Sequence, residues 1–434
     1  MHFQARKMED FSPYELDHAR ALDAQDALPT RRAEFHVPQH NGEDTIYFTG
    51  NSLGLQPKAA ADALQTELDD WAEHGVEGHF RARNPWVSYH ERFAAGLAQL
   101  VGAKPEEVVA MNALTVNLHL LLVSFYRPEG KRTKILCEAK AFPSDQYALA
   151  SQVRFHGGDP ETDIIEIAPR EGTSIIEEAD IEAVLRTSGD EIALVMMGGV
   201  QYFTGQWLDM ARITRAAHAA GAICGFDLAH AVGNVPLQLH DWDIDFACWC
   251  TYKYLNSGPG AVAGAFVHRR HVQSTSIPRF EGWWGHNAER RFLMEPEFDS
   301  MGTAEAWQMS NAPVFNMAIH AASLEQFSSV GMEALRAKSL RLTAYLEAGI
   351  QAVARQNNAQ LEVITPEDPD RRGCQLSLVA HGFGRELFQT LTDAGVVADW
   401  REPNVIRMAP VPLYNTFEDI ARFVRVLKSA TENN

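Results

Sequence analysis

Short apolar runs that alternate with helical stretches are the feature that most constrains this fold. Strands buried on both faces have this pattern, because neither face meets water. Helical stretches such as LTVNLHLLLVSFY (114–126) and DMARITRAAHAAG (209–221) separate the runs. The alternation predicts an α/β fold whose large domain has a mostly parallel sheet flanked by helices. The apolar runs are VVAMN (108–112), KILCE (134–138), DIIEIA (163–168), IALVMMG (192–198) and AICGFDL (222–228).

The pattern changes after about residue 312. A long helical region there leads into LEVITP, QLSLVA and NVIRMAPVPLY, with further helical segments between and after them. A chain of 434 residues is long enough for two or three domains. We expect an N-terminal segment (1–50) that packs with the small domain, a large cofactor-binding domain (51–311) and a smaller C-terminal α+β domain (312–434).

Charge and cysteine usage exclude several classes of partner. The formal net charge is −19, which argues against nucleic acid or an anionic membrane surface as a partner. No apolar stretch approaches the ~20 residues that cross a bilayer, and the polar start has no secretory apolar core. Five cysteines, an odd number, do not form a disulfide framework. Cys248 and Cys250 fit one face of a buried strand better than a metal pair, so no metal is expected. These features favour the cytoplasm.

A carboxylate and a lysine follow two successive apolar segments. In open parallel sheets, ligands bind beyond the carboxyl ends of the strands, where Asp227 and His230 of GFDLAHAVGN would lie. Lys253 comes directly after the next apolar segment, in CWCTYKYLNSGPG. Taken alone, Asp227 could cap a helix and Lys253 could extend to solvent. Together they predict a pyridoxal 5′-phosphate (PLP) site, in which one residue pairs with the ring nitrogen and the other bonds covalently to the cofactor.

Other segments could hold the phosphate and the ring of such a cofactor. Leu114 and Thr115 stand at the start of a predicted helix, where backbone N–H groups bind phosphate; Thr115 as a plain N-cap is compatible with this role. Phe142 could stack on the ring, with Asp145 close behind it. The pair of tryptophans in GWWGH (282–286) lies at a turn and indicates a site more than a core.

Seven stretches, in the same order along the chain, closely resemble kynureninase, a PLP enzyme family with the aspartate aminotransferase type of fold (fold type I). The resemblance runs from about residue 45 to the last helix, and the FDLAHA and YKYLN blocks are its most specific parts. The stretches are GNSLGLQPK (50–58), NALTVNLHLLL (112–122), FPSDQYA (142–148), GFDLAHAVGN (225–234), CWCTYKYLNSGPG (248–260), GWWGH (282–286) and RMAPVPLYNTFED (407–419).

The resemblance implies hydrolysis of L-kynurenine or 3-hydroxy-L-kynurenine to anthranilate or 3-hydroxyanthranilate plus L-alanine, in tryptophan catabolism or NAD biosynthesis. It assigns Lys253 to cofactor attachment and proton transfer, Asp227 to the ring nitrogen, and Arg407 to the substrate α-carboxylate. Tyr252 is our candidate donor to the attacked carbonyl oxygen, with the phosphate as its resting partner. The resemblance further implies cofactor contacts from Leu114, Thr115, Phe142, Asp145, His230, Trp283 and Asn311, the last two from the other subunit of a homodimer.

Selection between the two kynurenines is expected from polar groups around the substrate ring. His79, Ser310 and Asn311 are similar to ring-side positions of kynureninases that prefer the 3-hydroxy substrate, although His79 could simply pack under the N-terminal segment. Ser52 is a further expected substrate contact. Gly198 and Phe203 depart from the family pattern, since relatives often carry Ser and Tyr there. This departure puts any phosphate contact or ring hydroxyl from those positions in doubt.

Three alternatives stay open at this stage. The first is another PLP activity on the same fold, such as a desulfurase or an aminotransferase; Cys374 before QLSLVA is a poor candidate for the mobile cysteine of a desulfurase. The second is a PLP-binding regulatory domain, for which no basic helix-turn-helix stretch is visible. The third is a dehydrogenase-like protein, for which no Gly-rich dinucleotide turn is present.

Overall fold

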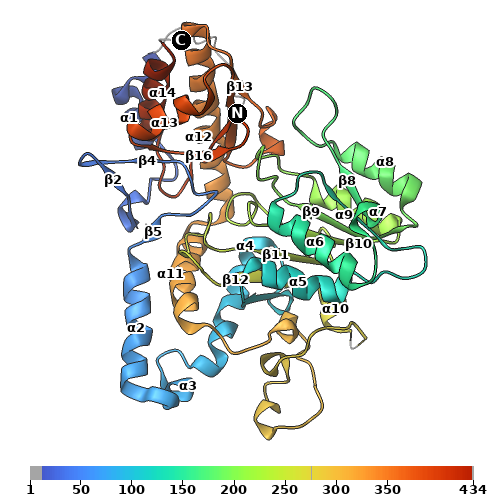
Figure 1. Cartoon of the computed structure of the whole chain (residues 1–434). Helices are drawn as coiled ribbons and strands as arrows, with labels where there is room; N and C mark the ends of the chain where they lie inside the picture. Colours follow the sequence, from blue (N-terminus) through green and yellow to red (C-terminus); the bar gives the residue numbers. More distant parts are fainter. Residues whose placement is uncertain (1–11, 275, 433–434) are drawn as a thin grey trace.

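The fold is built on a mixed seven-stranded sheet. A computed structural model describes residues 12–274 and 276–432 of the chain (Figure 1). All strands run parallel except β12, which is antiparallel to both of its neighbours. The prediction of an α/β fold with a mostly parallel sheet is confirmed. The strand order is β6 (Val108–Met111), β12 (Ala263–Val267), β11 (Phe246–Trp249), β10 (Ile223–Asp227), β9 (Ile192–Gly198), β7 (Lys134–Glu138) and β8 (Ile164–Ile167).

Helices cover both faces of this sheet, which explains why its strands are apolar throughout. In β11, Phe246 and Cys248 pack into the core beneath α5 and α6, whereas Ala247 and Trp249 point into the core on the opposite face. Successive side chains of a strand face opposite ways, so a strand covered on both sides must be apolar at every position. The main covering helices are α5 (Leu114–Phe125) and α6 (Pro143–Phe155) on one face, and α4 (Ala94–Val101), α8 (Glu178–Ser188), α9 (Met210–Ala219) and α11 (Val314–Val330) on the other.

Two glycines in the sheet make room for aromatic rings on the neighbouring strands. Gly225 lies beside Phe246, and Gly264 lies beside Trp249. A Cβ atom at either glycine would come within 2.2 Å of the adjacent ring. Neither position can therefore carry a side chain without displacing a fully buried aromatic residue.

A second core lies at the C-terminal end of the chain. Its sheet is antiparallel, in the order β13 (Leu361–Val363), β14 (Leu376–Ala380), β17 (Val405–Met408) and β16 (Asp399–Arg401). Helices α12 (Met332–Asn357), α13 (Gly384–Asp393) and α14 (Phe417–Thr431) pack on it. From the N-terminal segment, Tyr14, Ile46 and Phe48 join this core.

The change from one core to the other falls within the first turns of α12, just after Gly331 separates this helix from α11. Phe327 of α11 packs into the core of the large sheet, and Leu342 of α12 into that of the small sheet. Gly331 has a φ of 81°, a left-handed conformation that separates the two helices. The domain division at residue 312 stays a prediction.

The remaining helices and strands are short or peripheral, apart from α2. Among the described residues, no helix combines the length and apolarity needed to span a bilayer. All five cysteines are buried thiols. The other elements are α1 (Leu16–Ala24), α2 (Ala59–His74), α3 (Gly78–Arg81), α7 (Pro160–Asp163), α10 (Arg269–Val272), β1 (Phe35–His36), β2 (Gln39–His40), β3 (Glu43–Asp44), β4 (Ile46–Tyr47), β5 (Gln56–Pro57) and β15 (Val396–Val397).

Candidate active site

A cavity of about 90 Å³ lies beyond the carboxyl ends of the parallel strands. Strands β7, β9 and β10 and helices α5 and α6 all contribute to it, as does the bend after β11. This is where ligands bind in open α/β sheets. The lining residues are Leu114, Thr115, Glu138, Phe142, Ser144, Asp145, Gly198, Val200, Tyr202, Asp227, Ala229, His230, Tyr252 and Lys253.

Lys253 and His230 form a hydrogen-bonded pair in this cavity. The Lys253 Nζ atom lies 2.9 Å from His230 Nε2. Burial, followed by the charge of Lys253, lowers the pKa of His230 well below its ordinary value. His230 is therefore neutral and accepts this bond through Nε2, so its proton resides on Nδ1. That nitrogen is buried and has no partner among the described residues.

Asp227 and Asp145 form a carboxyl pair on the adjacent wall. Asp227 ends β10 and accepts a 2.6 Å hydrogen bond from the Ala229 N–H. Burial raises the pKa of both carboxyl groups, and the charge of Asp227 raises that of Asp145 further. The Lys253 ammonium and the Ala229 N–H favour the ionised form of Asp227. Asp145 accordingly holds the proton of the pair, and Asp227 carries the negative charge.

The N-termini of two helices meet at one side of the cavity. Thr115, in the first turn of α5, lies with its Oγ1 2.7 Å from Ser144 Oγ in the first turn of α6. Backbone N–H groups at such ends attract phosphate. Tyr252 lines the same cavity, and burial, followed by the neighbouring Cys250, raises the pKa of Tyr252 well above its ordinary value. Tyr252 is therefore a neutral phenol that can donate a hydrogen bond.

Two aromatic side chains border the cavity. Phe142 lines the cavity and is 43% exposed, so its ring is accessible to a ligand. Its ring meets Tyr202 edge-on at 5.4 Å between centroids, and the Lys253 ammonium lies 5.8 Å from the Phe142 centroid. Tyr202 lines the cavity, whereas Phe203 does not. A phenol is therefore present in the cavity lining next to Phe203, the position whose ring hydroxyl was in doubt.

Arg407 lies behind Tyr202 and does not line the cavity. It is 1% exposed, and its Nη1 donates a 2.6 Å hydrogen bond to the Tyr202 carbonyl oxygen. Nη2 pairs with Asp399, and Nε has no partner among the described residues. One edge of the guanidinium is thus available, but binding of the substrate α-carboxylate by Arg407 stays a prediction.

Besides Arg407, five residues assigned from the resemblance lie outside the cavity in this chain. All five lie near the surface. His79 lies in α3, where its Nδ1 is 3.0 Å from the Val76 carbonyl oxygen and its ring meets the Trp86 ring edge-on. Trp283 is 48% exposed. The site roles of these five residues stay predictions. The set is Ser52, His79, Trp283, Ser310 and Asn311.

Sequence reasoning did not identify Glu138, Ser144 or Tyr202 as part of the site. Glu138 carried a usable signal, since it ends the apolar run KILCE just as Asp227 ends its own run. Ser144 was visible only as a member of the FPSD stretch. Nothing in the sequence marked Tyr202 over its neighbour Phe203.

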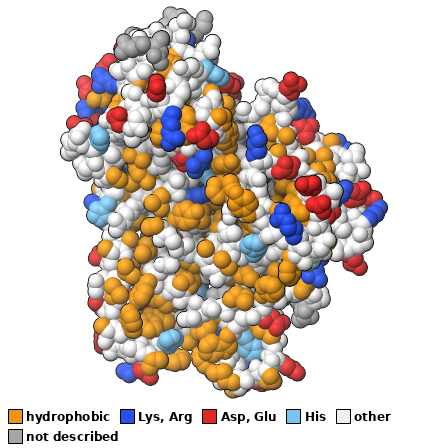
Figure 2. Space-filling model, in the orientation of Figure 1, with side chains coloured by type: hydrophobic (Ala, Val, Ile, Leu, Met, Phe, Trp, Pro, Cys, Tyr) orange, Lys and Arg blue, Asp and Glu red, His pale blue; other side chains and the backbone are white. Residues whose placement is uncertain are grey.

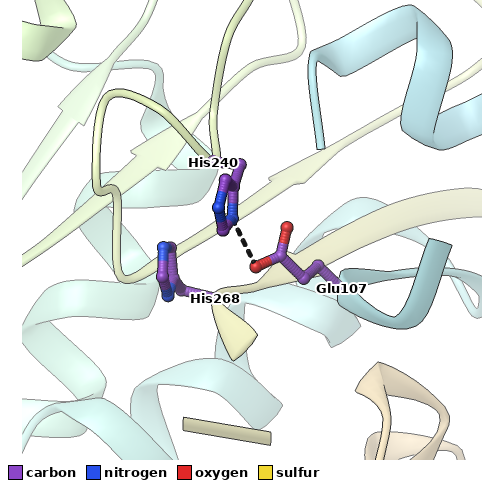
Figure 3. A group of neighbouring side chains, drawn as sticks. All are labelled: Glu107, His240 and His268. Atoms are coloured by element: carbon purple, nitrogen blue, oxygen red, sulfur yellow. Dashed lines mark hydrogen bonds and ion pairs between the residues drawn. The ribbon is translucent and has the colours of Figure 1, made fainter. Parts of the chain in front are cut away.

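Outside the cavity, the side chains of Glu107, His240 and His268 come together as possible metal ligands (Figure 3). The two imidazole rings are stacked, with centroids 4.8 Å apart and planes 7° from parallel. Imidazole lone pairs lie in the ring plane, so two stacked rings cannot both direct a lone pair at one ion. Glu107 is already bonded to His240 Nδ1 at 2.8 Å and to the Arg269 and Lys104 N–H groups. This arrangement is that of a structural contact.

The residues of the cavity fit PLP. Lys253 supplies the amine, Asp227 an anionic partner for a protonated ring nitrogen, and Phe142 an accessible aromatic ring. Two buried polar atoms, Asp145 Oδ1 and His230 Nδ1, have no partner among the described residues and would gain one from polar groups of the cofactor.

Comparison with known proteins agrees with this fit. The chain is 55% identical over 419 residues to a kynureninase of Flavobacterium psychrophilum, covering 96% of this chain and 99% of the relative. It is 54% identical over 411 residues to a kynureninase of Myxococcus xanthus, covering 94% and 96%.

A family model and a solved structure point the same way. The model of the kynureninase C-terminal domain matches residues 335–427. An apo cysteine desulfurase from Thermococcus onnurineus shares the fold, with a TM-score of 0.75, 16% identity and coverage of 90% of this chain and 95% of that one. Extensive identity over nearly the whole length shows that the chain belongs to the kynureninase family.

Proposed function

We propose that this protein hydrolyses the Cβ–Cγ bond of L-kynurenine or 3-hydroxy-L-kynurenine, releasing L-alanine and the corresponding anthranilate. The convergence of Lys253, Asp227 and two helix N-termini on one cavity carries the proposal, within a chain of this family. Bound PLP supplies an electron sink for the bonds that break at the substrate.

The charges in the cavity would let Lys253 act as the base while Asp227 remains the anion. Lys253 would move the proton at the substrate Cα, and its bond to the neutral Nε2 of His230 orients the amine. Asp227 would keep the ring nitrogen protonated, while the proton on Asp145 keeps the negative charge on Asp227. Thr115 and Ser144 would hold the phosphate together with the N–H groups of α5 and α6.

Tyr252 and Arg407 would act on the substrate. As water adds to the γ-carbonyl carbon, the carbonyl oxygen becomes negative, and the Tyr252 phenol would donate a hydrogen bond to it. Arg407 would bind the α-carboxylate, which competes with Asp399 for the guanidinium. We place Ser52, His79, Ser310 and Asn311 around the substrate, where polar groups favour the 3-hydroxy compound.

We further propose that two copies form a homodimer through an exposed apolar region. Large apolar side chains gather over the lower half of the face in Figure 2. Among those on the surface near α2, α3 and residues 283–315 are Trp71, Phe80, Trp283, Phe292 and Phe315, each at least 38% exposed. Their rings pair as Trp71–Phe315, Phe80–Phe292 and Trp283–Phe292, with centroids 5.5–6.2 Å apart. Exposed patches of this kind mark protein interfaces.

Three of the predicted site residues that lie outside the cavity, His79, Trp283 and Asn311, are in or next to this same region. His79 precedes Phe80, Trp283 is part of it, and Asn311 comes shortly before Phe315. A dimer through this surface is consistent with their delivery to the partner's cavity. Five buried thiols favour a reducing compartment, and we infer the cytoplasm.

The test is an absorbance spectrum of the purified protein beside Lys253→Ala, followed by separate addition of the two kynurenines. We expect a yellow lysine-linked cofactor in the wild type only, loss of the aryl ketone absorbance, and release of alanine. A protein that stays colourless with added PLP would refute the cofactor site. A yellow protein inert to both substrates would refute the reaction, and light scattering of the same sample tests the dimer.

A further inference from the structure

Glu138 is a third carboxyl group in the cofactor cavity, and the reaction described above does not use it. It ends β7, is 4% exposed and lines the cavity. Its Oε2 accepts a 2.7 Å hydrogen bond from the Gly198 N–H. No second hydrogen bond to Glu138 occurs among the described residues, so its other oxygen, Oε1, is free to meet a ligand.

Gly198 is what lets Glu138 occupy this place. Residues 138, 198 and 227 end the neighbouring strands β7, β9 and β10, so they form one row along the cavity. A Cβ atom on residue 198 would lie 2.9 Å from Glu138 Oε1. The glutamate carboxyl thus takes the position that a side chain at residue 198 would otherwise occupy.

Charge balance decides the protonation state of this row. Glu138, Asp145 and Asp227 are all buried, and Lys253 is the only cation among the described residues that line the cavity. Three ionised carboxylates facing one ammonium would repel one another strongly at this depth. Burial raises the pKa of Glu138 to about 7, and the charge of Asp227 also raises it.

The other groups facing the row do not supply a compensating charge. His230 is neutral, because burial lowers its pKa. Tyr202 is a phenol whose pKa is raised by burial. The low-energy arrangement places protons on Glu138 and Asp145 and one negative charge on Asp227.

We propose that Glu138 is a positioning residue that receives the cofactor as a neutral carboxylic acid, with its free oxygen toward the cofactor and the single negative charge left on Asp227. The proposal rests on the PLP site described above. Ionising Glu138 would add a second negative charge beside Asp227, in a cavity that must admit an anionic phosphate. If the protonated form binds, PLP affinity falls about tenfold one pH unit above the pKa of the group.

The test is equilibrium binding of PLP to the cofactor-free protein between pH 6 and 8, comparing wild type with Glu138→Gln. The amide keeps the size of the side chain and an acceptor for the Gly198 N–H but cannot ionise. Since every other titrating group of the protein and of the cofactor is common to both measurements, the ratio of the two dissociation constants isolates Glu138. Glu166→Gln, an exposed carboxylate on the neighbouring strand β8, is the matched control.

We expect similar affinities for wild type and Glu138→Gln at pH 6, and about tenfold weaker binding by the wild type at pH 8. Glu166→Gln should follow the wild type. Parallel profiles for wild type and Glu138→Gln, or weaker binding by Glu138→Gln at every pH, would overturn the proposal.

An infrared titration of cofactor-free wild type, with 13C-labelled glutamate, decides the matter if the variant does not fold. A protonated-carboxyl band that is present at pH 6 and lost by pH 8 supports the proposal, and its absence at pH 6 overturns it. Wild type that fails to bind PLP at any pH would instead refute the cofactor site, while the infrared result still reports on Glu138.

Discussion

Replacing Asp245, which does not line the active-site cavity, with asparagine should destabilise the large domain. Asp245 is 2% exposed and lies immediately before β11. Its carboxylate accepts hydrogen bonds from the Cys224 N–H at 2.7 Å, His218 Nε2 at 2.8 Å and His271 Nε2 at 2.7 Å. It also pairs with Arg270. These bonds hold the pKa of Asp245 far below its ordinary value despite burial.

The expected loss follows from the burial of this network. Breaking a buried ion pair by removing one partner typically costs about 3–5 kcal/mol. Arg270 and His218 keep 31% and 28% of their side-chain surface exposed, so water compensates part of the loss. The asparagine side chain of Asp245→Asn would still accept from Cys224 but would direct an N–H₂ group at other donors. We therefore expect about 3 kcal/mol, the lower end of that range.

Urea unfolding at pH 7 measures this loss, with Asp243→Asn as the matched control. Asp243 pairs with the same Arg270 and lies 3.4 Å from His218 Nδ1, yet its side chain is 60% exposed. Exposed pairs contribute about 0–1 kcal/mol, so the control should lose little. Equal losses in both variants, or no loss in Asp245→Asn, would refute the argument from burial.

The difference in unfolding free energy between wild type and Asp245→Asn should depend on pH. The pKa of Asp245 is lowered in the folded state, so its contribution is present above the ordinary value of 3.8 and is lost as pH falls toward the folded value. The pKa of His218 is raised, chiefly by its bond to Asp245, so its contribution is present below 6.5 and is lost as pH rises through the folded value. The stability gap between wild type and Asp245→Asn should therefore be largest from about pH 4 to 6.5.

Two further substitutions test the core and the substrate site. Gly264→Ala would place a methyl group 2.2 Å from the Trp249 ring. Overpacking of this kind should lower the free energy of unfolding in urea by about 1–3 kcal/mol. The control Gly302→Ala, with no described neighbour within 4 Å, should be neutral. Arg407→Lys should raise KM for kynurenine at least about tenfold with little change in kcat, because an ammonium cannot bind a carboxylate bidentately. Steady-state kinetics that show a fall in kcat alone would contradict a role in carboxylate binding.

The large sheet could be predicted from the sequence because strands buried on both faces are apolar at every position. Every predicted run from 108 to 228 contains a strand. The direction of β12 could not be predicted in the same way, since Ala263–Val267 is as apolar as the parallel strands. Burial fixes which residues are apolar, but it does not distinguish parallel from antiparallel pairing.

The site was predictable where chemistry requires an unusual residue. A lysine or a carboxylate at the end of an apolar strand is costly to desolvate, so Lys253 and Asp227 stood out. Ser144 and Tyr202 are residue types common in any turn, and their roles depend on how the ends of β9 and α6 converge. Glu138 carried a signal as the end of an apolar run, but only the structure shows that its carboxyl group lies where a side chain at Gly198 would lie.

The apolar residues near α3 and residues 283–294 illustrate a different limit. Phe80, Trp283 and Leu293 are large apolar residues, yet they are 62%, 48% and 65% exposed. Burying such a side chain contributes about 1.5–3 kcal/mol, which this chain does not gain by its own folding. On the proposed dimer, the contact that recovers this energy is also the one that brings Trp283 and Asn311 to a partner's cavity. Assembly and completion of the active site would then share one interface, so polar substitutions at Phe80 should weaken both together.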